Sequence, residues 1–220
     1  MTGTTSASLH QLPAWADVTA MTVAALFTAH VARRRRVPLF GVLLAGTIGG
    51  LGGGMVRDVL LGLEPAAITT WYYIPVVVGA AILGGLAAYR VRLDRLPFVA
   101  AQGAAVGLLI GIGVQKAVQY HAPPPSAILL GVITGTFGGT IDEILTGRRA
   151  TIMSEGPWLL SVVVLGAVTF WLFTIYIGFY LAVVVTAILV ASLRFLSVRQ
   201  NWTSPVFPGD DLHSADSDSI

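Results

Sequence analysis

The chain has no cysteine, few histidines and few charged residues, and these shortages exclude whole classes of function. Without cysteine it has no disulfide, iron–sulfur cluster, thiolate metal site or thiol nucleophile. Its four histidines are scattered along the sequence, which leaves little for a zinc site. The motifs GxSxG and HExxH and the P-loop lysine motif are also missing. We therefore predict that the protein is not an enzyme and that it has no metal centre, no cofactor and no catalytic residues.

Charged residues make up only 11% of the 220 residues, whereas 55% are hydrophobic and the mean hydropathy is +0.79. Soluble domains carry about 25% charged residues. The apolar residues come in blocks of about twenty, which is the length of a helix that crosses a hydrocarbon core of about 30 Å. The composition therefore predicts an all-α integral membrane protein.

Seven such blocks predict seven transmembrane helices. The last two are joined in one long apolar stretch, which we divide near Thr174–Gly178. The predicted spans are Ala14–Ala32, Pro38–Leu61, Trp71–Tyr89, Leu96–Val118, Ser126–Thr146 and two helices within Pro157–Leu193. The polar residues before the first block lack the basic segment of a secretory signal, so we expect the first span to remain in the mature protein.

The basic residues predict the orientation of these spans, because positively charged loops stay on the cytoplasmic side. With the N-terminus outside, the inner segments hold eleven of the 13 Lys and Arg residues, and the outer segments hold only Lys116. We therefore predict an outer N-terminus and a cytoplasmic C-terminus. This distribution also explains the basic pI of 9.2 without nucleic acid as a partner.

A constant shift of 85 residues aligns the chain with itself. It places Pro38 on Pro123, Gly53–Gly54 on Gly138–Gly139 and Gly62 on Gly147, without gaps. Because each copy would hold three helices, an odd number, the second copy enters the membrane from the opposite side. The predicted organisation is a polar outer segment (1–13), a first three-helix repeat (14–95), an inverted second repeat (96–174), a seventh helix (175–199) and a disordered cytoplasmic tail (200–220).

The second helix of each copy carries a run of glycines. Each glycine costs a helix interior roughly 1 kcal/mol relative to alanine. Such a run indicates either close helix packing or a helix that is broken so that freed backbone groups face a cavity. The candidate break positions are Gly49, Gly50, Gly52, Gly53 and Gly54 in the first copy, and Gly138 and Gly139 in the second.

Ionisable residues follow both glycine runs and favour the broken helix. They are Arg57 and Asp58 in the first copy and Asp142 and Glu143 in the second. Charges inside a membrane are functional candidates, because burying them unpaired costs several kcal/mol. Neighbouring residues on a helix do not face each other, so we expect Arg57 to pair with Asp142 or Glu143. The four groups sum to −2, which favours cations over anions.

The alternative for Arg57 is that it snorkels to the interface. On a straight helix it lies about 28 Å from Pro38, close to the opposite membrane surface. Thr136 and Thr140 offer hydroxyl groups to an ion path, although threonine also bonds its own helix. Lys116 is predicted to be an interface anchor or a charge at the pore mouth.

The runs LFGVLLAGTIGGLGGGMVRDVLLGLEP and AILLGVITGTFGGTIDEILTG, with GVQKA before the second, resemble the trimeric intracellular cation (TRIC) channel family. The resemblance is to its prokaryotic members and to related bacterial proteins with glycine-transporter domains. It implies a homotrimer with a pore through each protomer, in which the second and fifth helices are broken at the glycines. It also implies monovalent cations as the conducted ions, chiefly potassium with sodium as a second candidate. The resemblance further implies that the protein lies in a prokaryotic plasma membrane and contacts membrane lipids.

By position, the resemblance makes Arg57, Asp58, Asp142 and Glu143 the polar lining of the pore. The chain departs from the family pattern at Asp142, where the second GGGxxRD motif would have arginine. A carrier of a small zwitterion such as glycine remains the alternative function, because inverted repeats and half-helix ends also suit a carrier.

Overall fold

The computed structural model describes residues 14–90, 96–147, 159–200 and 202, and this part of the chain is helical. The predicted outer segment and most of the predicted tail lie outside the described residues. The helices are α1 Ala14–Arg34, α2 Leu39–Leu60, α3 Ala66–Thr69, α4 Tyr73–Ala87, α5 Leu96–Gln119, α6 Pro124–Leu145, α7 Leu160–Tyr176 and α8 Phe179–Arg199. Five of them, α1, α2, α5, α6 and α8, are long and apolar enough to cross a membrane, and α4 and α7 are shorter apolar helices. The all-helical membrane fold is thus confirmed.

The backbone repeats itself at the same 85-residue spacing. Helices α2 and α6 each span 22 residues and each begins after a proline, whose fixed φ suits a helix start. Arg36 and His121 both have a positive φ, 61° and 57°, just after α1 and α5. Gly62 and Gly147, with φ of 71° and 70°, follow α2 and α6 in the left-handed conformation common at helix ends. The two halves therefore end their helices in the same way at matching positions.

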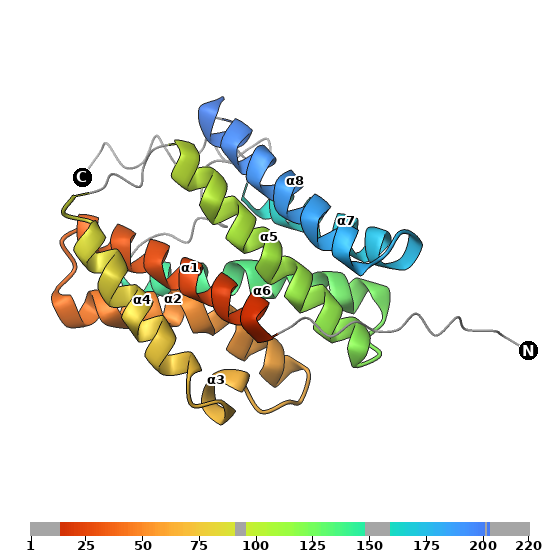
Figure 1. Ribbon diagram of the computed structural model, residues 1–220, viewed down its shortest axis with the longest axis horizontal. Helices are drawn as coiled ribbons and strands as arrows, with labels where there is room; N and C mark the ends of the chain where they lie inside the picture. The colour runs from red at the N-terminus through yellow and green to blue at the C-terminus, as the bar shows by residue number, and fades with distance from the viewer. Residues whose placement is uncertain (1–13, 91–95, 148–158, 201, 203–220) are drawn as a thin grey trace, which may run out of the picture.

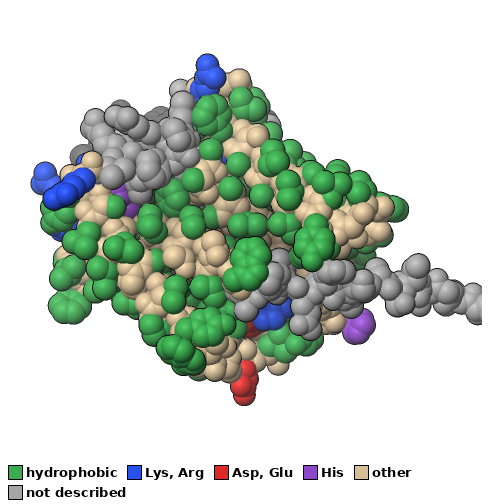
Figure 2. Space-filling view, viewed as in Figure 1, with side chains coloured by type: hydrophobic (Ala, Val, Ile, Leu, Met, Phe, Trp, Pro, Cys, Tyr) green, Lys and Arg blue, Asp and Glu red, His purple; other side chains and the backbone are tan. Residues whose placement is uncertain are grey.

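The helices form two groups joined through the centre of the molecule (Figure 1). Helices α1, α2 and α4 pack together, as do α5, α6 and α7, and α8 packs along α5. The pairs α1–α5 and α2–α6 connect the groups, and α1 and α5 run in opposite directions (Figure 1). Hydrophobic side chains cover most of the visible surface, and basic side chains gather at the ends where α1 and α8 finish (Figure 2). An apolar surface of this kind suits a lipid environment.

Helices α2 and α6 cross at their glycines and are continuous through them. A methyl group at Gly53 would overlap the carbonyl oxygen of Thr134, and one at Gly138 would overlap that of Gly49. One at Gly52 would lie 3.3 Å from the Cα of Gly138. The predicted breaks are therefore wrong and the packing alternative holds, because the missing side chains let the two backbones touch, and that contact offsets the helix cost of glycine.

The two copies have exchanged a threonine and a glycine at matching positions. Gly49 of α2 packs against the side chain of Thr28 in α1. In the second copy the positions equivalent to Gly49 and Thr28 are Thr134 and Gly113, and a methyl group at Gly113 would lie 2.6 Å from Oγ1 of Thr134. The same space between two helices is thus filled from opposite sides in the two copies.

Candidate functional site

Asp58 is the centre of a buried group of charged residues. The group lies beyond the α2–α6 crossing, towards the C-terminal end of α2. Arg57 and Asp58 are each only 1% exposed. Nε of Arg57 donates to Oδ1 of Asp58 at 2.7 Å, and Nζ of Lys116 donates to the same oxygen at 2.8 Å. The amide of Ala66, at the start of α3, donates to Oδ2 at 3.1 Å. Three donors from three helices thus stabilise the Asp58 carboxylate.

Asp17 of α1 extends this network. Its Oδ1 lies 3.6 Å from Nη1 of Arg57, and its Oδ2 accepts a hydrogen bond from the hydroxyl of Tyr73 in α4 at 3.0 Å. We call Asp17, Arg57, Asp58, Tyr73 and Lys116 the Arg57 cluster. Its two cations balance its two carboxylates, so the cluster is neutral and ties together α1, α2, α4 and α5.

The pairing predicted for Arg57 is wrong, because its partners are Asp58 and Asp17 rather than Asp142 or Glu143. The reason lies in the crossing: Gly49 meets Gly138 while Gly53 meets Thr134, so α2 and α6 are antiparallel there. Residues that follow the crossing on each helix consequently lie on opposite sides of it. The long Arg57 side chain instead folds back to the residue next to it.

Two other expectations for the charged residues are corrected. Arg57 does not snorkel, because it is buried within the protein. Lys116 is more than an interface anchor, since its ammonium group binds Asp58 while its side chain remains 25% exposed.

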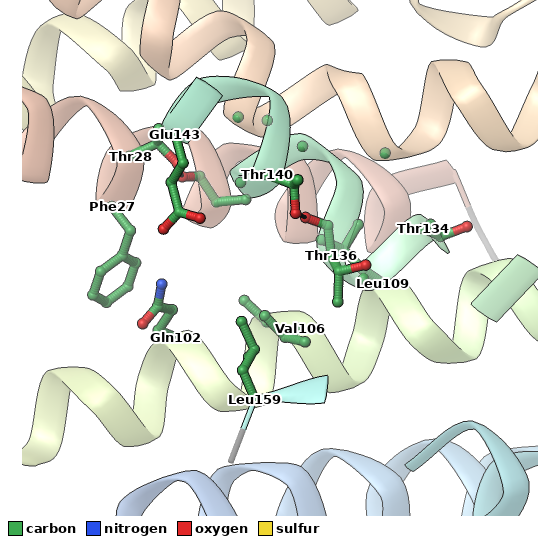
Figure 3. Close-up of a pocket in the computed structure, with 18 of the residues that line it drawn as sticks. Phe27, Thr28, Gln102, Val106, Leu109, Thr134, Thr136, Thr140, Glu143 and Leu159 are labelled. Carbon is green, nitrogen blue, oxygen red and sulfur yellow. Dashed lines mark hydrogen bonds between the residues drawn. The ribbon is translucent and has the colours of Figure 1, made fainter. Parts of the chain in front are cut away.

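A polar cavity of about 140 Å³ lies on the other side of the crossing (Figure 3). It is large enough to hold several water molecules. The glycines Gly49, Gly50, Gly53, Gly138 and Gly139 form part of its wall. Its polar lining consists of Thr28, Gln102, Thr134, Thr136, Thr140, Glu143 and Arg194. We call it the Glu143 cavity.

The polar groups of the Glu143 cavity differ in their availability. The hydroxyls of Thr136 and Thr140 donate to the carbonyls of Val132 and Thr136, four residues back on their own helix, at 2.7 and 3.0 Å. Their oxygens can still accept hydrogen bonds. Glu143 and Gln102 lie at the same end of the cavity in Figure 3, next to Phe27. The cavity thus combines a carboxylate, a guanidinium and several neutral polar groups.

The structure divides the predicted site residues between two places. Thr136, Thr140 and Glu143 line the cavity, whereas Arg57, Asp58 and Lys116 belong to the Arg57 cluster. Asp142 is buried but is not among the cavity-lining residues. Gly52 lies in the crossing, and Gly54 packs against Met21.

Six polar residues of these two sites were not predicted from the sequence, and two of them, Thr28 and Thr134, are threonines of the cavity wall. Asp17 and Gln102 are 85 residues apart, so they occupy equivalent positions in the two copies. The repeat register could therefore have indicated both residues as site candidates. Tyr73 has the sequence position of an interfacial aromatic, but its hydroxyl binds Asp17. Arg194 belongs to α8, outside the repeats, so the register carries no signal for it.

The fold and these sites define an all-helical membrane protein with an internal duplication and a polar cavity at its centre. Two segments, residues 14–92 and 99–175, match the model of the family described as "Glycine transporter", and their starts lie 85 residues apart. The chain is 30% identical over 209 residues to the UPF0126 inner membrane protein YadS of Escherichia coli, covering 90% of this chain and 97% of that protein. It is 28% identical over 200 residues to a UPF0126 membrane protein of Deinococcus radiodurans, covering 87% and 90%. The chain belongs to this glycine-transporter (UPF0126) family of membrane proteins.

Solved structures of TRIC channels share its fold. The TRIC orthologue from Rhodobacter sphaeroides superposes with a TM-score of 0.77 at 24% identity, over 85% of this chain and 97% of that chain. A prokaryotic TRIC channel studied in 0.5 M KCl superposes with a TM-score of 0.75 at 19% identity, over 85% and 95%. The expected resemblance to prokaryotic TRIC channels is therefore confirmed at the level of the fold.

Proposed function

We propose that the protein is a cation channel whose ion path runs through the Glu143 cavity. The observation that carries this proposal is the position of the cavity: it lies between two antiparallel glycine-packed helices, in a fold shared with TRIC cation channels. Within it Glu143 supplies negative charge, and threonine oxygens supply ligands of the kind that replace water around a monovalent cation. Potassium is the ion that we propose for this path.

The proposed path continues past the glycine crossing towards the Arg57 cluster. The cavity lining reaches Gly53 and Thr134 at the crossing, and Arg57 lies one helical turn beyond Gly53. We infer that the Arg57 cluster closes the path in this conformation, because its charges bind one another. Lys116, the partly exposed cation of the cluster, is the member that can leave Asp58 at the smallest cost.

We further propose that the protein forms homotrimers with one path in each protomer, and that its two repeats are inverted in the membrane. The Rhodobacter sphaeroides protein that shares its fold is a trimeric intracellular cation channel orthologue, which supports the trimer. The opposite directions of the contacting helices α1 and α5 support the inversion. Under the positive-inside rule, the Arg57 cluster then faces the outside and Glu143 faces the cytoplasm.

Thiol labelling tests this orientation, and the cysteine-free chain is suited to it. Glu64 and Arg35 are exposed residues beyond opposite ends of α2. In intact cells an impermeant maleimide should label Glu64→Cys, whereas Arg35→Cys should react only after the membrane is opened. The reverse pattern would refute an outer N-terminus.

The channel is tested with purified protein in planar bilayers under a KCl gradient. We expect current steps that reverse near the potassium equilibrium potential. Glu143→Gln removes the negative charge of the cavity and should lower the ratio of potassium to chloride permeability by about tenfold, as expected for one charge in a partly screened site. Glu64→Gln, an exposed glutamate outside the cavity, is the matched control and should leave the reversal potential unchanged. Equal reversal potentials in wild type and Glu143→Gln would contradict this pore assignment.

A carrier of a small zwitterion is the second candidate, and the lining of the cavity favours it specifically. Glu143 and Arg194 place a carboxylate and a guanidinium in one cavity, which suits the ammonium and carboxylate ends of an amino acid such as glycine. The same protein in vesicles should then take up labelled glycine saturably, without current steps. Currents without saturable uptake would favour the channel.

A further inference from the structure

Arg194 of α8 lies outside the two repeats, yet it lines the cavity of the second one. We propose that Arg194 supplies to the second copy the positive charge that Arg57 supplies to the first, and so sets the electrostatic selectivity of the Glu143 cavity. This inference goes beyond the proposed channel, because it concerns which charged molecules enter the cavity, whether the protein is a channel or a carrier.

The repeat register shows that the two copies differ in charge at matching positions. The 85-residue shift places Asp17 on Gln102, Arg57 on Asp142 and Asp58 on Glu143. The first copy therefore has an arginine beside its carboxylate, whereas the second has an acid at the arginine position. A cation near a carboxylate stabilises it inside a membrane protein, and at the Arg57 position the second copy does not supply that cation itself.

The packing of α8 on α5 brings Arg194 to this place. Gly103 of α5 leaves room for α8, since a methyl group there would lie 2.9 Å from Cα of Ala191 and 3.3 Å from Cβ of Arg194. Gln102, which corresponds to Asp17, is the residue next to Gly103. The Cβ of Arg194 in α8 thus lies against the part of α5 that corresponds, in the repeat register, to the region around Asp17 in α1.

The surroundings of Arg194 fit a charge-balancing role. Arg194 and Glu143 line the same cavity and carry opposite charges, which attract each other across it. Among the residues that the structure describes, Nη1 of Arg194 is buried and has no hydrogen-bond partner. That N–H group is free to bind an acceptor on a molecule in the cavity. With Arg194 present, the net charge of Glu143 and Arg194 is zero rather than −1. A molecule bound in the cavity can therefore carry a negative group.

The charge of the cavity can be measured without any transport assay, because the chain has no cysteine of its own. Thr136→Cys places one thiol in the cavity, and its reaction rates with an anionic and a cationic methanethiosulfonate are compared. We expect Arg194→Gln to shift the anionic-to-cationic rate ratio about tenfold towards the cationic reagent. Glu143→Gln should shift it by a similar factor in the opposite direction, and Arg194→Lys should keep the wild-type ratio.

Arg199→Gln is the matched control, because Arg199 is an exposed arginine on the same helix and is not among the cavity-lining residues. It should leave the rate ratio unchanged. If Arg194→Gln does not fold, comparing Glu143→Gln with the double variant Arg194→Gln/Glu143→Gln reports the charge of Arg194 in a background without the Glu143 carboxylate. A rate ratio that does not respond to Arg194, or a thiol that reacts with neither reagent, would overturn the proposal. A shifted ratio in a protein that takes up glycine saturably and carries no potassium current would refute the channel and leave this inference standing.

Discussion

Gly138→Ala is expected to destabilise the folded protein strongly, because the added methyl group would overlap the carbonyl oxygen of Gly49 in α2. Backbone atoms on both sides of the crossing cannot rotate away as a side chain can, so the two helices must separate. Overpacking of this kind costs about 3 kcal/mol, and the loss of contact along α2 and α6 adds to it. Thermal unfolding of the protein in detergent, followed by size-exclusion chromatography, measures the effect. The expected result is a large drop in midpoint or a loss of the folded peak.

Gly139→Ala is the matched control for this prediction. Gly139 is the next residue on α6, and a methyl group there would meet no atom of the described residues within 4 Å. Alanine favours a helix over glycine by roughly 1 kcal/mol, so this variant should be as stable as wild type or slightly more stable. Equal losses in Gly138→Ala and Gly139→Ala would show that the glycines do not act through the helix crossing.

Asp58→Asn is expected to have the second large effect. The substitution removes the negative charge that balances Arg57 and Lys116. Among the described residues, the buried Arg57 is then left with the more distant Asp17 as its sole counter-charge. Removing one partner of a buried ion pair costs about 3–5 kcal/mol, because the remaining charge has lost its counter-charge. The unfolding midpoint in detergent should fall accordingly, and it should fall less in the double variant Asp58→Asn/Arg57→Gln.

Lys116→Gln provides the comparison within the same cluster. The Lys116 side chain is partly exposed, and Asp58 keeps Arg57 and the Ala66 amide as partners when the ammonium group is lost. We expect a cost of about 1 kcal/mol, close to the range of exposed ion pairs. A loss in Lys116→Gln as large as that in Asp58→Asn would place the stabilising charge on Lys116 rather than on Arg57.

Much of the fold was predictable because membrane spans and repeats leave strong patterns in a sequence. Apolar blocks of about twenty residues indicated the helices, and a constant shift from Pro38 to Pro123 indicated the duplication. The continuity of α2 was not predictable, since a run of glycines suits both a broken helix and a close crossing. Only the position of Thr134 opposite Gly53 decides between them.

The candidate site was predicted in its residue types and not in its pairing. Arg57 and Asp142 occupy equivalent positions and were expected to pair, but the antiparallel crossing of α2 and α6 places them on opposite sides of that crossing. Gln102 follows from Asp17 by the same 85-residue register. Arg194 has no counterpart in either copy, so only the packing of α8 against α5 reveals it.

The antiparallel crossing of α2 and α6 also bears on the direction of ion flow in the proposed channel. At the crossing the two copies present nearly the same backbone to each other, so the centre of the molecule has little polarity of its own. Its two approaches are chemically unlike: one holds a closed set of four charges, and the other is a cavity lined by one acid, one base and neutral polar groups. In the proposed channel an ion would therefore meet a different sequence of barriers from each side, and we expect its current to rectify.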